Sequence, residues 1–356
     1  MHDCLVALGS NLGNRAAFLR QAVTEIKKHP QVSRVRRSQW YTTPPIGGPG
    51  SQGDFLNGAV RFATSLSPQQ VLHLLQRIEK TLQRRRNIHW GPRTVDLDLL
   101  LYDHIICASA QLSIPHPRMI YRGFVLVPSV EIAAEMIHPL TGWTIQQLFN
   151  NLVRQPHYIA ITGTIGVGKT DLMHSVAQKV PGHLVHDTIS DNTLHKYYSS
   201  PMDSAWETEN KLLNQRSSAL CHKGLADETQ LILSDFWWEQ SLAYANLWMQ
   251  DDVLTRLEAT MRAQRDKVLS PTLVILLHAP TSILLEQIRS RNRSYEQTLS
   301  IDWLTSLTHA LRNRARELGT GPVIELDITS PQITAEVTAS LQAIYAPVVP
   351  ASHVKS

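Results

Sequence analysis

The sequence predicts two domains of different fold class: an α+β domain over residues 1–153 and an α/β domain with a parallel sheet over residues 156–346. The length of 356 residues exceeds what a single hydrophobic core normally serves. An apolar strand runs into a glycine turn and then a helix at two places, residues 5–15 and 158–170. Between them, Pro156 ends a helix and marks the boundary.

Strands and helices alternate in the first half, which is typical of an α+β sandwich with helices packed on one sheet. The helix from Ser67 has a clear start, because Ser67 can cap it, Pro68 suits its first turn and Gln70 completes a capping box. The remaining elements are expected as strands at 5–8, 32–41, 55–64 and 94–103 and as helices at 14–28 and 144–152.

Short runs of Ile, Leu and Val alternate with helices in the second half. Such runs are typical of strands buried on both faces, so they predict a parallel sheet in a doubly wound fold. The runs lie at 159–162, 184–186, 231–234, 273–278 and 323–326. Residues 347–356 are expected to form a tail.

Composition and charge exclude several classes of protein. Hydrophobic residues make up 43% and charged residues 18%, which excludes a disordered chain. The three cysteines are scattered and lack metal-ligand spacing, which indicates a reducing compartment. No signal peptide is evident and no apolar run reaches the ~18 residues of a membrane helix, so we expect a cytoplasmic protein. A net charge of +4 without a basic–aromatic stripe argues against nucleic-acid partners and favours small-molecule substrates.

Two acidic residues, Asp96 and Asp98, lie on a predicted strand. Residues two apart on a strand point to the same face, and like charges that close need a cation between them or a shared proton. Carboxylates with open positions suit Mg²⁺. The alternative is a solvated strand face, but Arg84 and Arg93 nearby favour a phosphate-transfer site, because guanidinium groups bind phosphate oxygens. We interpret Arg85 as part of a solvated helix end.

The loop 43–47 is stiffened by two prolines and precedes Phe55 and Asn57, which share one face of a strand. An aromatic ring, an amide and fixed backbone groups can together recognise a flat heterocycle. The alternative interpretation is that Phe55 is a core residue.

Residues 163–170 match the phosphate-binding pattern G-x-x-x-x-G-K-[ST], with glycines at Gly163, Gly166 and Gly168. The pattern follows an apolar strand and opens a helix, as its chemistry requires. Backbone N–H groups cradle phosphates, Lys169 reaches the β- and γ-phosphates, and the Thr170 hydroxyl ligates Mg²⁺. A basic cluster at 289–293 is either a solvated helix end or a lid over the phosphates, and the phosphate loop favours the lid.

The first half, residues 5–152, resembles the 6-hydroxymethyl-7,8-dihydropterin pyrophosphokinase family. The matching stretches are GSNLGNR (9–15), YTTPPIG (41–47), DFLNGAV (54–60), QRIE (76–79), HWGPRTVDLDLLLYD (89–103), IPHPRM (114–119) and RGFVLVP (122–128). The resemblance implies a ferredoxin-like α+β fold. It also implies transfer of diphosphate from ATP to the pterin hydroxymethyl group, giving AMP and the pterin diphosphate of folate biosynthesis.

Carried over by position, the resemblance implies a role for each matching residue. Asp96 and Asp98 hold two Mg²⁺ ions, and Asp98 accepts the hydroxyl proton. Arg84 and Arg93 stabilise the transferring diphosphate. The ATP side comprises Gln76, Glu79, Arg86, His116 and Arg122, and the pterin slot comprises Thr43, Pro45, Phe55, Asn57 and Phe124. Phe55 stands where many relatives have Tyr, and the loop between Arg86 and Trp90 is one residue short of the family's.

The second half resembles the deoxynucleoside kinase family, and within it bacterial deoxyadenosine/deoxyguanosine kinase-like domains. The matching stretches are the phosphate loop, 186–201, 214–216, 233–247 and 295–297. The resemblance implies transfer of the ATP γ-phosphoryl group to the 5′-hydroxyl of a deoxynucleoside, with one Mg²⁺ at Thr170. It places Arg291 and Arg293 on ATP, and Glu209 and Arg216 on the deoxynucleoside.

Several positions depart from this second family. Asp187 stands where the family has its catalytic Glu, and Glu209 where it has a base-recognising Gln, which changes a two-sided amide into an acceptor. Phe236 and Ser241 stand where relatives often have Arg and Asp.

The departures leave an alternative open for the second half: a non-catalytic nucleotide-binding or partner-subunit module, forming a dimer or hetero-oligomer. The aromatic cluster 236–238 is compatible with a partner-facing surface, although such clusters are more often core.

Overall fold

The computed structural model describes residues 1–48, 52–84, 91–221 and 231–351. The chain divides into two compact units, one of Met1–Val153 with Ala339–Ser356 and one of Arg154–Thr338. Arg85, Arg86 and Trp90 lie outside the described residues. Within the described ranges, the search for a helix that is long and apolar enough to cross a membrane found none.

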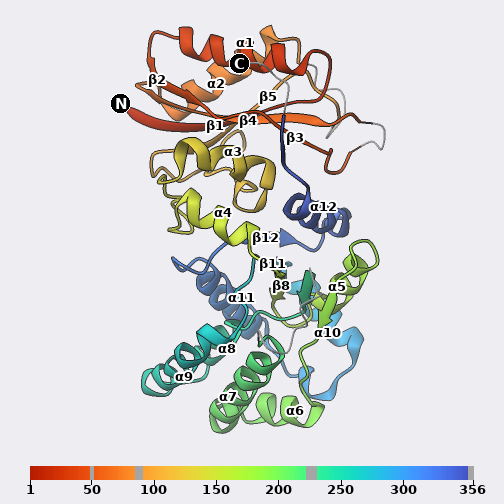
Figure 1. Cartoon of the computed structure of the whole chain (residues 1–356). Helices are drawn as coiled ribbons and strands as arrows, with labels where there is room; N and C mark the ends of the chain where they lie inside the picture. Colours follow the sequence, from red (N-terminus) through yellow and green to blue (C-terminus); the bar gives the residue numbers. More distant parts are fainter. Residues whose placement is uncertain (49–51, 85–90, 222–230, 352–356) are drawn as a thin grey trace. The chain divides into compact units, whose positions relative to one another are not determined.

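An antiparallel sheet forms the centre of the first unit (Figure 1). Its strands follow the order β13-β3-β4-β1-β5, and β2 also pairs with β4. The strands are β1 (His2–Ser10), β2 (Val32–Arg37), β3 (Tyr41–Thr43), β4 (Phe55–Thr64), β5 (Asp96–Tyr102) and β13 (Val349–Pro350). A separate small ribbon joins β6 (Cys107–Ala108) and β7 (Ser113–Ile114).

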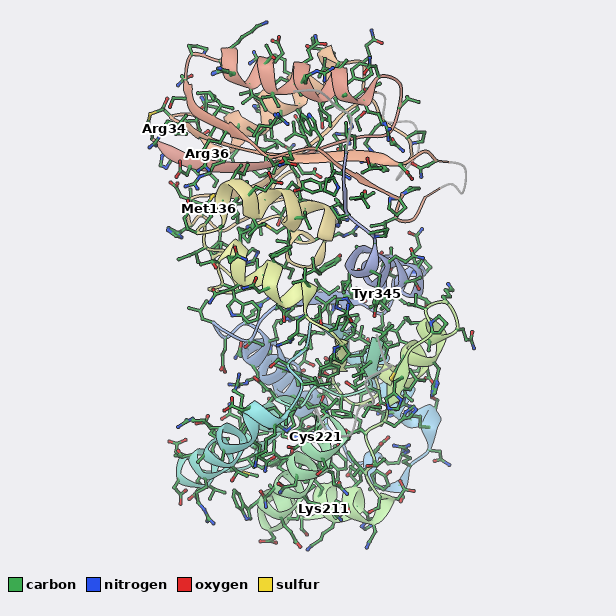
Figure 2. All side chains as sticks on the ribbon, viewed as in Figure 1. Arg34, Arg36, Met136, Lys211, Cys221 and Tyr345 are labelled. Carbon is green, nitrogen blue, oxygen red and sulfur yellow. The ribbon has the colours of Figure 1, made fainter. Side chains whose placement is uncertain are left out.

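The range predicted as one strand, 32–41, is two strands in the structure. β2 pairs with the second half of β4, whereas β3 pairs with the first half. The register of β2 shifts between Ser33 and Arg36, and Arg34 has a φ of 51°. Arg34 and Arg36 are exposed (Figure 2). A bulge and exposed charges both protect an edge strand against pairing with other chains.

Helices cover both faces of this sheet. α1 (Arg15–Lys28) and α2 (Pro68–Thr81) bury apolar residues in one core with the sheet, including Leu19, Leu75 and Phe62. On the other face, α3 (Gly123–Ala133) packs against β4 and α4 (Ile145–Val153) packs against α3, preceded by η1 (Met119–Tyr121). The sequence pattern did not predict α3, because its residues are apolar on every side and include an internal proline.

The start of α2 confirms the predicted capping box. The Ser67 hydroxyl accepts a hydrogen bond from the Gln70 backbone N–H at 3.4 Å, and the Gln70 side chain accepts one from the Ser67 N–H at 2.8 Å. Pro68 occupies the first turn, where its missing N–H costs nothing.

The second unit holds the predicted parallel sheet, with strand order β12-β11-β8-β10-β9. The strands are β8 (His157–Gly163), β9 (His183–Val185), β10 (Leu231–Ser234), β11 (Leu273–His278) and β12 (Val323–Asp327). The helices are α5 (Lys169–Ala177), α6 (Asp191–Ser199), α7 (Pro201–Ala219), α8 (Gln240–Ala245), α9 (Asp251–Gln264), α10 (Thr281–Arg291), α11 (Ile301–Ala315) and α12 (Ile333–Tyr345), with 3-10 turns η2 (Arg265–Lys267) and η3 (Ser294–Glu296).

The aromatic cluster 236–238 belongs to the core of the second unit. Phe236, Trp237 and Trp238 are 0%, 1% and 5% exposed and pack with the strands of the parallel sheet. The partner-facing interpretation of this cluster is therefore wrong, since side chains buried inside the fold present no surface to another chain.

The C-terminal residues differ from the tail expected over 347–356. The division between the units falls inside α12, so that residues 339–351 belong with the first unit. Val349 of β13 pairs with Thr42 of β3, and the backbone N–H of Ala351 donates to the Trp40 carbonyl at 2.9 Å. The local sequence contained no strand signal here, because two residues ending in proline have no periodicity to read.

Gly58, on β4, offers a test of packing at this sheet. A Cβ added there would lie 2.5 Å from the buried Trp40 ring, whereas one added at Gly53 would meet nothing nearer than 3.9 Å. We expect Gly58→Ala to lower the free energy of unfolding by about 1–3 kcal/mol through overpacking. The matched Gly53→Ala should change it by less than about 0.5 kcal/mol. Urea denaturation measures both, and equal effects would contradict this packing.

Candidate active sites

The candidate site of the first unit forms where three strands lie side by side. Gly9 of β1 pairs with Asn57 of β4 on one side and with Asp96 of β5 on the other. A Cβ at Gly9 would lie 3.1 Å from the Asn57 side-chain oxygen and near Phe55 and Asp96. The glycine therefore leaves room for polar side chains from both neighbouring strands, which gather on one face of the sheet.

Two arginines hold the Asp96 carboxylate. Arg84 Nη2 lies 2.6 Å from Asp96 Oδ1, and Arg93 donates to Asp96 Oδ2. Arg84 also donates to Glu79, whose carboxylate accepts the Leu97 backbone N–H at 2.9 Å. This arrangement brings together the acid and the guanidinium groups that the sequence predicted as neighbours.

Arg93 is itself fixed by Asn11, which the sequence analysis did not identify. The Asn11 side-chain oxygen accepts the Arg93 N–H at 2.8 Å, and the Asn11 N–H donates to the Arg93 carbonyl at 3.1 Å. Asn11 stands in the stretch GSNLGNR, so its place in that motif was the available signal.

Asp98 lies two residues along β5 from Asp96, on the same face. Burial and the negative charge of Asp96 raise the pKa of Asp98 to about 7, although Arg122 and Arg84 oppose the rise. Within the described ranges, no hydrogen-bond donor reaches its carboxylate. The positive charges of Arg122 and Arg84 therefore offset the negative charge of the ionised Asp98 carboxylate only in part.

This donor set fits magnesium. The carboxylates of Asp96 and Asp98 lie on one face and supply hard oxygen ligands, and the charge of Asp98 is offset only in part by neighbouring arginines. Among the described residues, no group of three or more His, Cys, Asp or Glu could hold a metal alone. In nucleotide sites Mg²⁺ is usually bound by one or two carboxylates together with substrate phosphates, which is the donor set that Asp96 and Asp98 offer.

The residues predicted for a pterin slot occupy neighbouring positions. The Asn57 amide donates to the Thr43 hydroxyl at 2.8 Å, and both side chains are buried. The Arg93 guanidinium lies 5.7 Å from the centre of the Phe55 ring, and that of Arg122 lies 5.3 Å from the Phe124 ring. Pro45 is partly buried in the loop after β3.

The residues predicted for the ATP side are less uniform. Burial and the charges of Arg122 and Arg118 lower the pKa of His116 to about 4, so its ring is neutral at pH 7. Its Nδ1 accepts the Arg118 N–H at 3.2 Å. Burial raises the pKa of Glu79, against the opposing charge of Arg84. Gln76 is exposed on α2, and Arg86 lies outside the described residues.

The phosphate loop of the second unit has the backbone its glycines permit. Gly163 and Gly166 have φ angles of 149° and 82°, and a Cβ at either would lie 2.5 and 2.7 Å from its nearest neighbour. Lys169 donates to the carbonyls of Gly163 and Thr164 at 3.0 and 3.3 Å. Burial lowers the pKa of Lys169 to about 8, although Asp235 and Asp187 oppose this.

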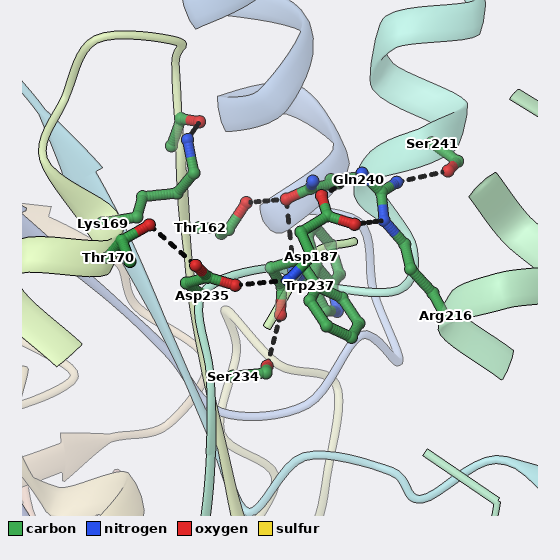
Figure 3. A network of polar contacts seen from close by, with 12 residues as sticks. Thr162, Lys169, Thr170, Asp187, Arg216, Ser234, Asp235, Trp237, Gln240 and Ser241 are labelled. Carbon is green, nitrogen blue, oxygen red and sulfur yellow. Dashed lines mark hydrogen bonds and ion pairs between the residues drawn. The ribbon is translucent and has the colours of Figure 1, made fainter. Parts of the chain in front are cut away.

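Parallel strands bring two acids to the edge where this loop begins. Asp235 follows β10 and Asp187 follows β9; β10 pairs in parallel with β8, and β9 pairs in parallel with β10. Asp235 accepts hydrogen bonds from the Thr170 hydroxyl at 2.7 Å and from the Asp187 N–H at 2.8 Å (Figure 3). Sequence reasoning missed Asp235, although an acid directly after a buried strand was a usable signal.

Arg216 of α7 holds the other end of this network. Its Nε and Nη2 donate to the two carboxylate oxygens of Asp187 at 3.0 and 2.6 Å, and its Nη1 donates to Ser241 at 2.7 Å (Figure 3). Glu209 is 2% exposed, and burial raises its pKa to about 7 against the opposing charge of Arg216. Phe236 packs beneath Arg216, with the guanidinium 5.7 Å from the ring centre.

Two arginines of the basic cluster after β11, Arg291 and Arg293, have different surroundings. Arg291, at the end of α10, is exposed, and its charge contributes to the lowered pKa of Lys169. Arg293 pairs with Glu296 at 3.3 Å. Glu296, which the sequence analysis did not identify, is 1% exposed, and its Oε2 has no hydrogen-bond partner among the described residues.

Comparisons with known proteins separate the same two regions. The family described as 7,8-dihydro-6-hydroxymethylpterin-pyrophosphokinase matches residues 5–134, and the deoxynucleoside kinase family matches residues 159–346. A 2-amino-4-hydroxy-6-hydroxymethyldihydropteridine pyrophosphokinase of Bacillus subtilis is 47% identical over 131 residues, which are 37% of this chain and 78% of that protein. The enzyme of the same name in Haemophilus influenzae is 39% identical, over 44% of this chain and 93% of its own length.

Two further similarities concern a bifunctional protein, of which this chain matches only part, and a solved structure of lower sequence identity. The bifunctional protein FolKE of Lactococcus lactis is 39% identical over 37% of this chain and 38% of its own length. The structure of deoxyadenosine kinase from M. mycoides is 20% identical, with a TM-score of 0.43, over 52% of this chain and 99% of that one.

The fold and the family matches together define a protein with two domains, each belonging to a family of phosphate-transferring enzymes. The chain belongs to the 7,8-dihydro-6-hydroxymethylpterin-pyrophosphokinase family in its first half and to the deoxynucleoside kinase family in its second. The parallel α/β sheet of the second unit agrees with this membership.

The lowered pKa of His116 predicts a pH effect on stability. Its folded pKa of about 4 lies below the unfolded value of about 6.5, so the stability it contributes is present above pH 6.5 and lost as pH falls toward 4. In His116→Gln, the stability loss between pH 7 and 5 should be smaller than in the wild type by about 2 kcal/mol. Urea denaturation at both pH values measures this, and an unchanged loss would contradict a neutral His116.

Proposed function

We propose that the first unit transfers diphosphate from ATP to 6-hydroxymethyl-7,8-dihydropterin, giving AMP and the pterin diphosphate. The observation that carries the proposal is the acidic pair Asp96 and Asp98 on one face of β5, with Arg84 and Arg93 on Asp96 and the Phe55 ring beside Arg93. The names of the Bacillus and Haemophilus relatives support the same reaction.

In this reaction the hydroxymethyl oxygen attacks the β-phosphorus of ATP, the bond from that phosphorus to the α–β bridging oxygen breaks, and AMP leaves. Phe55 and Phe124 stack on the flat pterin, while Asn57 and Thr43 offer it an amide and a hydroxyl. Arg84 and Arg93 turn from Asp96 to the phosphate oxygens, where guanidinium groups stabilise developing charge.

Asp98 is suited to accept the hydroxyl proton. A general base works best with a pKa near the operating pH, and burial beside Asp96 supplies that value. When Mg²⁺ is bound by Asp96 and Asp98, it supplies charge neutralisation for the phosphates. We include two ions in the proposal on the basis of the family resemblance.

A product assay tests this function directly. Full-length protein is incubated with ATP, Mg²⁺ and 6-hydroxymethyl-7,8-dihydropterin, and AMP and ADP are separated. We expect AMP in equal amount to the pterin diphosphate. Pterin-dependent formation of ADP in place of AMP, or no pterin-dependent turnover, would overturn the proposal for this unit.

Asp98→Asn should reduce AMP formation by at least about 100-fold, because it removes both a magnesium ligand and the proton acceptor. Lys169→Ala is the matched control, since Lys169 belongs to the phosphate loop of the other unit. The control should keep AMP formation within about twofold of the wild type. An active Asp98→Asn enzyme would contradict the assignment.

We further propose that the second unit transfers the ATP γ-phosphoryl group to the 5′-hydroxyl of a deoxynucleoside. The supporting observation is the line of contacts from Thr170 through Asp235 and Asp187 to Arg216, which starts at the phosphate loop. In phosphate-loop enzymes a Ser or Thr and an Asp hold Mg²⁺, and Thr170 and Asp235 take these roles in the proposal. Asp187, whose N–H donates to Asp235, acts as the proton acceptor.

The alternative is a non-catalytic nucleotide-binding module. It is favoured by one observation, the engagement of both Asp187 oxygens by Arg216, which holds this carboxylate in an ion pair within the protein.

Formation of ADP with each deoxynucleoside separates the two candidates. For an active kinase, Asp187→Asn should lower ADP formation by about 100-fold or more and Lys169→Ala should abolish it, while both variants keep forming AMP with the pterin. A chain that binds ATP but forms no ADP with any deoxynucleoside would show that the module interpretation is correct.

A further inference from the structure

Two parts of the proposed pyrophosphokinase site, β3 and the start of α3, contact residues near the C-terminus. Most of these residues follow the region that matches the deoxynucleoside kinase family. β13 lies along the outer edge of β3, with Val349 opposite Thr42 and Pro350 opposite Tyr41. Thr43, the next residue of β3, pairs with Phe55 and accepts the Asn57 amide. The C-terminal strand thus borders the strand that carries the pterin side of the site; it is drawn in blue beside β3 in Figure 1.

The second contact is at the start of α3. Gly123 stands between Arg122 and Phe124, two residues that we assign to the site. A Cβ at Gly123 would lie 3.3 Å from the Val348 side chain and 3.7 Å from the Ala343 carbonyl. The C-terminal segment therefore packs directly on the backbone that presents Arg122 and Phe124.

The segment is well anchored within the first unit. Leu341 and Ala343 of α12 are 0% and 2% exposed. The Ser340 hydroxyl donates to the Tyr121 hydroxyl at 3.2 Å. Ala351 donates its N–H to the Trp40 carbonyl and packs against the core that includes Trp40. Buried side chains and a hydroxyl hydrogen bond at one end, and a backbone hydrogen bond at the other, hold this segment in place.

We infer that residues 339–351 are a positioning element of the pyrophosphokinase site, fixing β3 and the start of α3 so that Thr43 and Phe124 face the pterin. A short edge strand such as β3, with three residues, is weakly ordered when its outer edge is unpaired. Pairing with β13 orders it, and Pro350, which has no N–H, closes the new edge against further strands. The first unit is therefore completed by residues encoded after the second.

Loss of this segment should weaken binding of the pterin more than binding of ATP. The segment borders Thr43 and Phe124 on the pterin side. Of the residues assigned to ATP, Arg122 also adjoins the segment at Gly123, so a small effect on ATP is expected, whereas Glu79 is held by Arg84 and the Leu97 N–H. A general loss of stability would raise no Michaelis constant selectively, so the ratio of the two Michaelis constants distinguishes positioning from mere support.

The first experiment removes residues 347–356 from the otherwise full chain. The shortened chain keeps both family matches intact. We expect the KM for hydroxymethyldihydropterin to rise at least 10-fold, the KM for ATP to change less than about threefold, and amide exchange of residues 41–47 to accelerate. Equal changes in both Michaelis constants, or unchanged exchange, would overturn the inference.

A pair of point variants keeps the inference testable if the shortened chain does not fold. Ala351→Pro removes the N–H that reaches the Trp40 carbonyl, and Ala351→Ser keeps it. We expect Ala351→Pro to raise the pterin KM about 2- to 10-fold, the equivalent of one net hydrogen bond, and Ala351→Ser to leave it unchanged. Equal pterin KM values in the two variants would overturn the inference.

The inference rests on the proposed pyrophosphokinase activity, and the experiments separate the two. Full-length protein that forms no AMP with the pterin would overturn the proposed activity. Full-length protein that forms AMP, with the pterin KM unaffected by the shortened C-terminus, would overturn only the role of residues 339–351. The exchange rate of residues 41–47 is measured without substrate and reports on the segment in either case.

Discussion

The first unit is organised around one electrostatic constraint, the proximity of two carboxylates on β5. Asp96 and Asp98 share a face of the sheet, and burial, followed by the negative charge of Asp96, raises the pKa of Asp98 to about 7. Arg84 and Arg93 neutralise Asp96, and Asn11 in turn fixes Arg93. Gly9 on the neighbouring strand leaves the space in which the Asp96 side chain lies near Asn57 and Phe55 of β4.

The second unit builds its candidate site by different means. Here a glycine-rich loop has positive φ angles at Gly163 and Gly166, the kind of backbone that forms anion-binding loops. The acids that accompany it come from the ends of parallel strands, so their proximity follows from sheet topology. In the first unit the corresponding proximity follows from strand register, since Gly9 pairs with both Asn57 and Asp96.

Features encoded by local patterns could be predicted from the sequence, whereas features set by distant contacts could not. The phosphate loop, the capping box at Ser67 and the parallel strands each depend on a few neighbouring residues, and the structure has them where they were expected. The helix α3 carries no amphipathic period, because both the sheet and α4 cover it. The strand β13 exists only because β3 presents an open edge, which no local pattern near residue 349 reveals.

The departures of the second unit from its family can be understood through Arg216. One guanidinium group binds both oxygens of Asp187 and also Ser241, and it lies on the ring of Phe236. Arg216 therefore binds Asp187 through two charge-assisted hydrogen bonds. Phe236, which stands where relatives often have Arg, adds no positive charge. A carboxylate has about four lone-pair sites, and a bidentate fork uses only two of them. Asp187 therefore keeps acceptor capacity for a substrate hydroxyl.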